Sequence, residues 1–281
     1  MVTNFVGVRK AGELLGKDQA TITAVAKIEE RDQNWAGRTI VGIPFESPHV
    51  MTSLVLDQPE AAELRDLAVE RKLFKVRLAD TEGRRNSASM LIRKMYSWRG
   101  YNVVGAVQEH PNRITLVASN EDAPVATISV GFDSPIGLLV DELYKDEIDV
   151  LRAAGQRICE FTKLAVDGAI RSKRVLASIF HIAYIYAYRI HSYSDLFVEV
   201  NPRHVKFYEK MLGFVQFGPE KQNRRVSAPA ILLRLNFEHA QRQIGMYGGH
   251  AELAVGEKSL YPYFFSVSEE AGIAGRLRRL S

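Results

Sequence analysis

Cysteine is nearly absent from this chain of 281 residues, which contains only Cys159. One cysteine excludes an internal disulfide framework and fits a reducing compartment. No charged-then-apolar signal peptide opens the sequence. Its most apolar segment, Val175 to Tyr188, is shorter than the roughly 20 residues that cross a bilayer. We therefore expect a cytoplasmic protein.

Recognised metal-binding and nucleic-acid-binding motifs are also missing. The seven histidines are scattered, and His181 with His191 does not match the His-Glu-x-x-His spacing of a metal pair. There is no helix-turn-helix signature, zinc-finger spacing or aromatic RNA-binding motif. We therefore predict no metal site and no nucleic-acid partner.

Positive charge is the main compositional bias, with a net charge of +4 and a pI of about 9.1. The basic residues form short clusters, which either are solvated faces or bind a polyanion. These clusters are Arg84-Arg85, Arg93-Lys94, Arg171 to Arg174, Arg224-Arg225 and Arg276 to Arg279.

The pattern of apolar and turn residues predicts an α/β domain with an extension at each end. Residues 1–56 are assigned to an N-terminal extension, 57–240 to the core and 241–281 to a C-terminal tail. The predicted core elements are a helix over 57–72, a strand over Leu73–Ala79, a helix ending near Gly100, a hairpin of Ile114–Ala118 and Val125–Phe132, a helix over Asp146–Ala154, a strand around Glu160, a helix over Arg174–Ile190, a strand over Leu196–Val200, and a final strand pair, Phe214–Phe217 and Ile231–Phe237.

One stretch combines a buried strand, a sharp stop and a short helix. Leu196 to Val200 is rich in strand-forming residues, and Asn201 can cap a helix whose first turn accepts Pro202. Apolar residues from Val205 to Leu212 mark one side of about three helical turns, which we expect Gly213 to end in a left-handed conformation.

This stretch resembles the strand–helix–strand that closes the acyl-CoA N-acyltransferase (GNAT) fold. In that family an Asn opens the helix and a Tyr seven residues later, here Tyr208, lines the active site; the spacing from Tyr208 to Gly213 is one residue longer here. The strand Ile158 to Asp167 is similar to the fourth strand of the fold, and its Glu160-Phe-Thr-Lys163 resembles the Glu-x-x-Arg of acyl-homoserine-lactone synthases. With Leu91 to Tyr101 and Gly137 to Glu147, these blocks are most similar to the bacterial long-chain N-acyl amino acid synthases.

The resemblance implies a GNAT-type three-layer α/β fold, with a mixed, mostly antiparallel sheet flanked by helices and splayed between its fourth and fifth strands. It also implies transfer of a long acyl chain from the phosphopantetheine of an acidic acyl carrier protein to the amino group of an amino acid. No permanently bound cofactor is expected. A lipid product would bring transient membrane contact.

Two alternatives stay open: an N-acetyltransferase that uses acetyl-CoA, and a non-catalytic module that senses an acyl group or a nucleotide. The loop that follows the fourth strand argues against free acyl-CoA, because it lacks the paired glycines that let a backbone approach a pyrophosphate. Its Arg171, Ser172, Lys173 and Arg174 are instead expected to contact the carrier protein.

Amide formation from a thioester requires a neutral amine, a base, and hydrogen-bond donors for the developing oxyanion. Glu160 is the predicted base, because it interrupts an apolar strand where burial would raise its pKa. A structural ion pair with Lys163 or Arg157 is the alternative. Strict alternation sends Glu160 and Lys163 to opposite faces, so both reach one cleft only if the strand bulges, as it does in GNAT folds. Lys163 would then hold the acceptor's carboxylate.

The same bulge is expected to offer a backbone N–H near Leu164 or Ala165 to the acyl carbonyl, with Val166 beside them in the donor site. Tyr208 is expected either to protonate the leaving thiolate or to pack in the core. Tyr184 either lines an acyl tunnel or belongs to the core.

The remaining residues are assigned from position alone. Tyr96, Tyr101 and Asn201 are placed in the acceptor or acyl pocket. Cys159 is expected to face away from Glu160 and to pack in the core, because alternate residues of a strand point to opposite faces.

Overall fold

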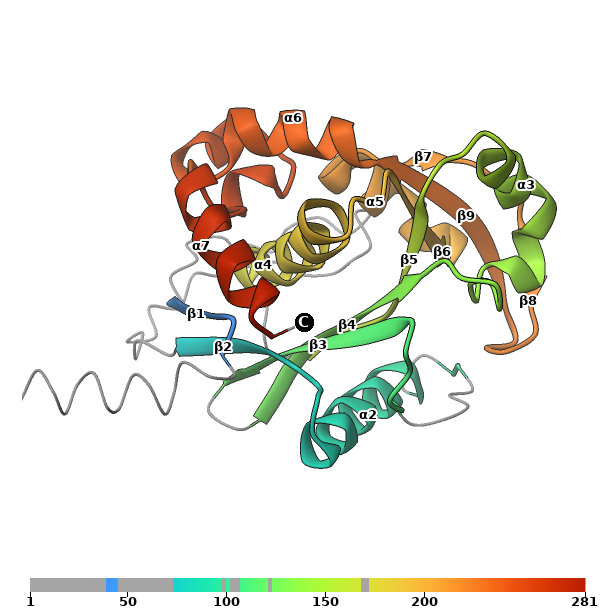
Figure 1. Cartoon of the computed structure of the whole chain (residues 1–281), viewed down its shortest axis with the longest axis horizontal. Helices are drawn as coiled ribbons and strands as arrows, with labels where there is room; N and C mark the ends of the chain where they lie inside the picture. Colours follow the sequence, from blue (N-terminus) through green and yellow to red (C-terminus); the bar gives the residue numbers. More distant parts are fainter. Residues whose placement is uncertain are drawn as a thin grey trace, which may run out of the picture. The chain divides into compact units, whose positions relative to one another are not determined.

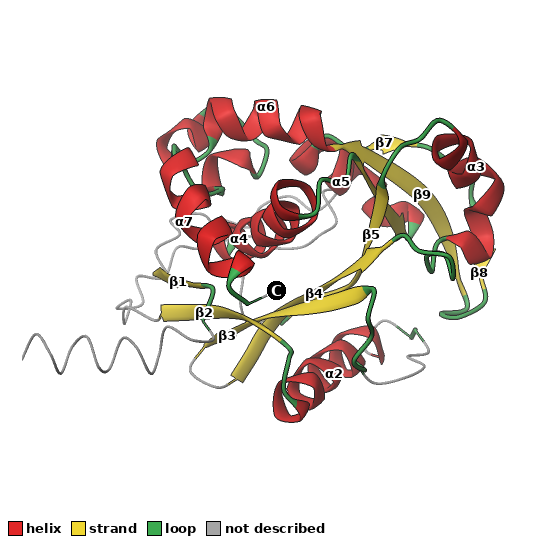
Figure 2. Ribbon diagram, in the orientation of Figure 1, coloured by secondary structure: helices red, strands yellow, loops and turns green. Residues whose placement is uncertain are grey.

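A mixed sheet organises the part of the chain that the structure describes (Figures 1 and 2). The computed structural model describes residues 39–44, 73–97, 100–101, 107–120, 123–167 and 172–280. Within these residues nine strands follow the order β1-β2-β3-β4-β5-β6-β9-β7, with β8 paired to β9. The predicted helix over 57–72 and most of the predicted N-terminal extension lie outside the described residues. The predicted domain boundaries therefore stay predictions.

Most strands form where the sequence predicts them. β2 (Leu73–Leu78) matches its predicted strand, and β3 (Arg113–Asn120) pairs with β4 (Ala123–Phe132) as the predicted hairpin. Two-residue β7 (Val215–Gln216) pairs with β9 (Ala228–Asn236), which confirms the final strand pair. The other strands are β1 (Val41–Pro44), β5 (Ile158–Val166), β6 (Asp195–Val200) and β8 (Lys221–Asn223).

The parallel pair β5 and β6 opens towards its carboxyl ends. Pairing joins Ile158 to Asp195, Cys159 to Leu196 and Glu160 to Phe197, and it stops there although both strands continue. This is the predicted splay, and its opening begins beside Glu160.

Helices cover both faces of the sheet (Figure 1). α2 (Glu82–Ser97) packs on one face, while α4 (Lys173–Tyr184) packs on the other beneath the C-terminal helices. The predicted helix over Asp146–Ala154 begins five residues earlier, at Asp141, as α3 (Asp141–Ala153). The other helical segments are η1 (Ile185–Ile190), η2 (Pro202–His204), α5 (Val205–Leu212), α6 (Phe237–Tyr247), η3 (Ala251–Val255), η4 (Tyr261–Tyr263) and α7 (Val267–Arg278).

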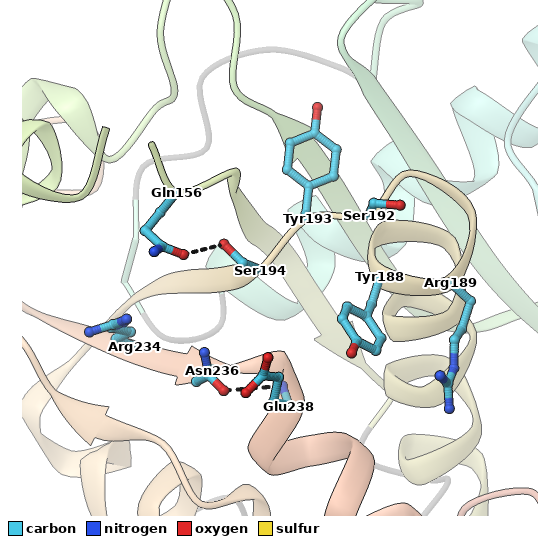
Figure 3. Close-up of a pocket in the computed structure, with 9 residues that line it drawn as sticks. All are labelled: Gln156, Tyr188, Arg189, Ser192, Tyr193, Ser194, Arg234, Asn236 and Glu238. Carbon is cyan, nitrogen blue, oxygen red and sulfur yellow. Dashed lines mark hydrogen bonds between the residues drawn. The ribbon is translucent and has the colours of Figure 1, made fainter. Parts of the chain in front are cut away.

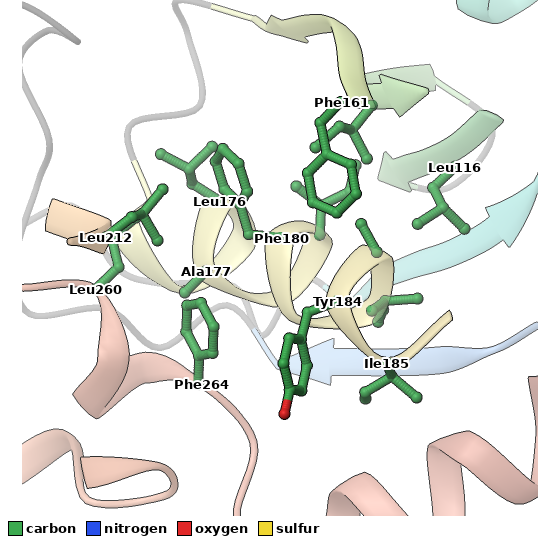
Figure 4. Close-up of a cluster of buried hydrophobic side chains, with 14 of the residues drawn as sticks. Leu116, Phe161, Leu176, Ala177, Phe180, Tyr184, Ile185, Leu212, Leu260 and Phe264 are labelled. Atoms are coloured by element: carbon green, nitrogen blue, oxygen red, sulfur yellow. The ribbon is translucent and has the colours of Figure 1, made fainter. Parts of the chain in front are cut away.

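The main hydrophobic core surrounds α4, where every residue from Val175 to Tyr184 is buried (Figure 4). The predicted long helix continues beyond α4 as π-helical η1, which ends at Ile190 as expected. Side chains from β5 and from the C-terminal segment, such as Phe161 and Phe264, pack around it. Each such burial stabilises the fold by about 1.5–3 kcal/mol relative to an exposed side chain.

The C-terminal segment, which the sequence left without assigned elements, is helical and packs on this core. A capping box between Ser266 and Glu269 begins α7. Buried Glu270 then accepts hydrogen bonds from His181 Nε2 at 3.0 Å and from Arg189 Nε at 2.5 Å. These contacts attach α7 to α4 and η1.

Candidate active site

The predicted bulge on β5 is present at Lys163. Thr127 pairs with Ala165 and Ser129 with Thr162, so two residues of β5 lie opposite one residue of β4. Lys163 adopts a left-handed φ of 52°, and its carbonyl accepts a hydrogen bond from Thr127 Oγ1 at 2.9 Å. Positive φ is costly for a residue with a side chain, and such strain is concentrated at functional sites.

Glu160 is fully buried on the face of β5 that α2 and α3 cover. Its Oε2 accepts a hydrogen bond from the Val140 N–H at the start of α3, at 3.1 Å, and its Oε1 lies 3.3 Å from Arg113 Nη2. Gly131 makes room for it, because a Cβ at that position would lie 2.8 Å from the Glu160 Cγ. A buried carboxyl is thus held by backbone N–H groups at the start of α3 and by one guanidinium.

Burial raises the pKa of Glu160, while the backbone donors of Leu139 and Val140 and the charge of Arg113 oppose the rise. Burial also lowers the pKa of Lys163. Arg113 lowers it further, whereas Glu160 raises it. The bulge therefore brings Lys163 within the electrostatic influence of both Arg113 and Glu160.

Arg113 is a functional candidate that the sequence analysis missed. It begins β3 and lies opposite Gly131 of β4, which in turn lies opposite Glu160 of β5. The sequence offers no signal for it, because a basic residue at a strand end is usually a solvated side chain.

Tyr208 and Tyr184 lie in the main core around α4, whereas Glu160 lies on the other side of the sheet. The Tyr208 ring meets Phe180 and Phe214 edge-on, with centroids 6.3 and 5.4 Å away. Tyr184 lines an apolar cavity of about 20 Å³. That cavity is lined by Phe161, Phe180, Tyr184, Leu196, Leu212, Phe214, Leu235, Phe237, Ala240, Tyr261 and Phe264.

Tyr96, Tyr101 and Asn201 gather where the end of α2 meets η2. The rings of Tyr96 and Tyr101 are 6.1 Å apart, and the Tyr101 hydroxyl accepts a hydrogen bond from Arg203 Nη2 at 2.9 Å. Asn201 caps η2 by accepting a hydrogen bond from the Arg203 N–H at 3.3 Å. The structure thus brings together three of the four residues predicted for the acceptor or acyl pocket and places Tyr184 elsewhere.

The predicted donor residues follow the bulge and lead into α4. Leu164 and Val166 pack against the main core, while Ala165 is buried under α2. Ser172 caps α4 by accepting a hydrogen bond from the Val175 N–H at 3.3 Å. Lys173 and Arg174 occupy the first turn, where the helix dipole disfavours cations and favours a bound anion. Arg171 lies outside the described residues.

A second, polar pocket of about 540 Å³ lies at the opposite end of the β5–β6 pair (Figure 3). Its arginines are already paired: Arg234 Nη2 lies 2.7 Å from Asp195 Oδ1, and Arg189 binds Glu270. The pocket is lined by Gln156, Tyr188, Arg189, Ser192, Tyr193, Ser194, Arg234, Asn236 and Glu238, none of which belongs to the predicted site.

Among the described side chains, no group of three or more His, Cys, Asp or Glu residues is placed to hold a metal ion. None of the helices within the described residues combines the length and the hydropathy that crossing a bilayer requires.

Comparison with known proteins gives a family match over residues 87–236, more than half of the chain, to the family described as N-acyl amino acid synthase FeeM. The structure is similar to that of FeeM, an N-acyl amino acid synthase from uncultured soil microbes, with 28% identity, a TM-score of 0.57 and coverage of 61% of this chain and 95% of that one. No curated protein matches the chain in sequence.

More distant solved structures include an acyl-CoA N-acyltransferase from Pseudomonas aeruginosa, with 15% identity and a TM-score of 0.39 over 57% of this chain and 97% of that one. They also include the acyl-homoserine-lactone synthase LasI, with 11% identity and a TM-score of 0.40 over 59% and 91%. The sheet order, the splay and the similarity to FeeM confirm the predicted GNAT-type fold.

Proposed function

Because the chain belongs to the FeeM family of N-acyl amino acid synthases and is an N-acyltransferase, we propose that it transfers a long-chain acyl group from acyl carrier protein to the amino group of an amino acid. The observation that carries this proposal is the fully buried Glu160, which lies where β5 and β6 begin to separate. A thioester entering the splay would meet this carboxyl at the centre of the sheet.

Glu160 is the general base of the proposed reaction. It takes a proton from the acceptor's ammonium group, and the neutral nitrogen then attacks the thioester carbon. A raised pKa suits this role, since a base works best when its pKa lies near the working pH. The new C–N bond forms, the C–S bond breaks, and the second nitrogen proton neutralises the thiolate, with Tyr208 as the proposed intermediary.

The bulge and its neighbours position the two substrates. The backbone around Leu164 and Ala165 would receive the acyl carbonyl oxygen, in the manner of an oxyanion hole. Lys163 would hold the acceptor's carboxylate, and Arg113 would reinforce it with a guanidinium, whose fork matches carboxylate geometry better than an ammonium does.

The start of α4 is the proposed docking point for the donor. Ser172, Lys173 and Arg174 provide a helix N-terminus with two cations, and Arg171 precedes them in the sequence. An acidic carrier protein would gain from these charges, whereas a small pantetheine thioester would not. Charge reversal at Lys173 and Arg174 should therefore raise the KM for the carrier protein far more than the KM for acyl-pantetheine. Equal changes for both donors would contradict docking at this surface.

The apolar cavity beside Tyr184 is the proposed end of the acyl site, but its volume of about 20 Å³ holds no long chain without movement of its walls. This one observation favours the alternative of a short donor such as acetyl-CoA. Burial of each methylene contributes about 0.8 kcal/mol, so a real tunnel should favour long donors steeply.

A donor series from acetyl to hexadecanoyl, offered on both carrier protein and coenzyme A with pooled amino acids, tests the function. We expect mass spectrometry to detect N-acyl amino acids, with the highest kcat/KM for carrier-protein donors of roughly twelve or more carbons. Equal rates for acetyl-CoA would establish the acetyltransferase alternative. Tight acyl binding without any product would contradict the proposed reaction.

A further inference from the structure

A second carboxylate, Glu199, lies on the other side of the splay from Glu160. The last β5–β6 pair joins Glu160 to Phe197, and Glu199 follows two residues later on β6. Because strand residues alternate between faces, Glu199 shares the face of Phe197, which packs with the residues under α3. Glu160 and Glu199 therefore line the same opening from its two strands.

Only one carboxylate oxygen of Glu199 accepts hydrogen bonds from the described residues. Its Oε2 accepts hydrogen bonds from Arg225 Nη2 at 2.5 Å and from Asn223 Nδ2 at 3.0 Å. Its Oε1 is buried and has no hydrogen-bond partner among the described residues. The side chain is 11% exposed.

Two further buried polar atoms on the same face also lack a hydrogen-bond partner within the described part of the chain. Thr162 Oγ1 lies two residues beyond Glu160 on β5, and Arg113 Nε belongs to the guanidinium that contacts Glu160. Buried polar atoms are nearly always hydrogen-bonded, and three exceptions around one carboxyl require a reason. A polar substrate group that enters the splay would provide it.

The electrostatic surroundings distinguish Glu199 from an ordinary ion pair. Burial is the largest influence and raises the pKa of Glu199 to about 7. The negative charges of Glu160 and Glu142 raise it too, while Arg225 and Asn223 lower it. Tyr144, which also faces Glu199, carries a raised pKa that keeps it neutral. The negative charge of Glu160 thus opposes the ionisation of Glu199, as expected for a second carboxylate near the same opening.

We propose that Glu160 and Glu199 form a carboxylate pair that binds the acceptor's ammonium group across the splay and takes up the first of its two departing protons. The pair later releases that proton to solvent, and the second proton leaves with the thiol, so charge and atoms balance. This inference rests on the proposed function and adds to it a subsite for a primary amine. Arg113 Nε remains available to the carboxylate of the same amino acid.

Three variants test the pair. Glu199→Gln removes the second carboxylate. Glu142→Gln removes the charge of a side chain that is 47% exposed. This side chain contacts Arg225 Nε at 3.0 Å but does not line the splay. Glu147→Gln is the matched control, because it removes a carboxylate of the same helix α3 that pairs with Lys221 at 2.7 Å. For each variant, kcat and KM for the amine acceptor are measured from pH 5 to 9.

For Glu199→Gln we expect a rise of at least about tenfold in the acceptor's KM and a changed acid limb of kcat/KM. For Glu142→Gln we expect the acid limb to move to lower pH, since loss of a negative charge lowers the pKa of Glu199. The rate at pH 6 should then rise about twofold. Glu147→Gln should match the wild type. Unchanged profiles in both Glu199→Gln and Glu142→Gln would overturn the pair.

A titration that needs no acyl transfer keeps this test separate from that of the proposed function. Infrared difference spectra should show a protonated carboxyl band that titrates near neutral pH in the wild type. The band should be lost in Glu199→Gln and should move to lower pH in Glu142→Gln or when the amine acceptor is added. If Glu199→Gln does not fold, the shift of the band in Glu142→Gln tests the pair instead. If the pH at which the band titrates changes neither in Glu142→Gln nor on addition of the amine, the pair is refuted even if the enzyme is active.

Discussion

The two faces of β5 differ in what they bury. Towards α4 the strand presents Cys159 and Phe161 to an apolar cluster, and Phe161 packs against Phe180 with ring centroids 6.5 Å apart. Towards α2 and α3 it presents the fully buried Glu160 and also Thr162, whose buried Oγ1 has no hydrogen-bond partner among the described residues. Burying polar groups costs stability unless they are fully paired. The incompletely paired second face is therefore where we propose that the chemistry takes place, while the first face supports the fold.

Substitution of Glu160 should give the largest effect on the polar face. Gln is nearly isosteric and its amide oxygen can still accept the Val140 N–H, so Glu160→Gln should fold. Without a base, kcat should fall by about two orders of magnitude or more. Steady-state kinetics with thermal unfolding as the folding control measures this. A folded variant that retains more than about half of the wild-type rate at neutral pH would show that the polar face is structural.

Crowding Glu160 without touching its charge should have a smaller effect. In Gly131→Ala, the new Cβ would meet the Glu160 Cγ and Oε1, both at 2.8 Å, and displace the carboxyl. We expect a loss of about 1–3 kcal/mol of stability and a drop in kcat on the order of tenfold.

Gly275→Ala in α7 is the matched control. A Cβ at Gly275 meets no atom within 4 Å, and alanine favours a helix by about 1 kcal/mol, so stability should rise and activity should not change. If Gly131→Ala behaves like Gly275→Ala, the position of Glu160 does not matter to the reaction.

Features set by local chemistry could be predicted from the sequence. Asn201 caps its helix, and Gly213 ends α5 with a left-handed φ of 76°, both as expected. The bulge at Lys163 followed from the spacing of two polar residues on one strand together with the family resemblance.

Features that depend on sheet order could not be predicted. Arg113 lies 47 residues from Glu160 in sequence, and only the pairing of β3, β4 and β5 joins them. The sequence places Glu199 in a strand, but no neighbouring residue indicates that the pairing of β6 with β5 stops two residues before it. The start of α3 was missed because Val140 occupies the N-cap position without a capping side chain.

Glu199 should make the polar face sensitive to pH. Its pKa is raised from 4.5 to about 7 in the folded state, so its contribution to stability is complete below pH 4.5 and is lost as the pH rises through 7. The wild type should therefore lose about 1–2 kcal/mol between pH 5 and 8 relative to Glu199→Gln, after allowance for solvent screening. Urea unfolding of both proteins at each pH gives this difference. Parallel pH dependences would show that Glu199 ionises normally.

On the apolar face, two tyrosines should respond in opposite directions to loss of the hydroxyl. Both line the cavity, but the Tyr261 hydroxyl donates to the Leu212 carbonyl at 2.7 Å, whereas the buried Tyr184 hydroxyl has no hydrogen-bond partner among the described residues. Tyr261→Phe should cost about 1 kcal/mol, since it leaves a buried carbonyl without its donor. Tyr184→Phe removes an unpaired polar group and should be neutral or stabilising by up to about 1 kcal/mol. Thermal unfolding should separate the two by about 2–4 °C or more. Equal destabilisation would mean that the Tyr184 hydroxyl has a polar partner and that this face is not purely apolar.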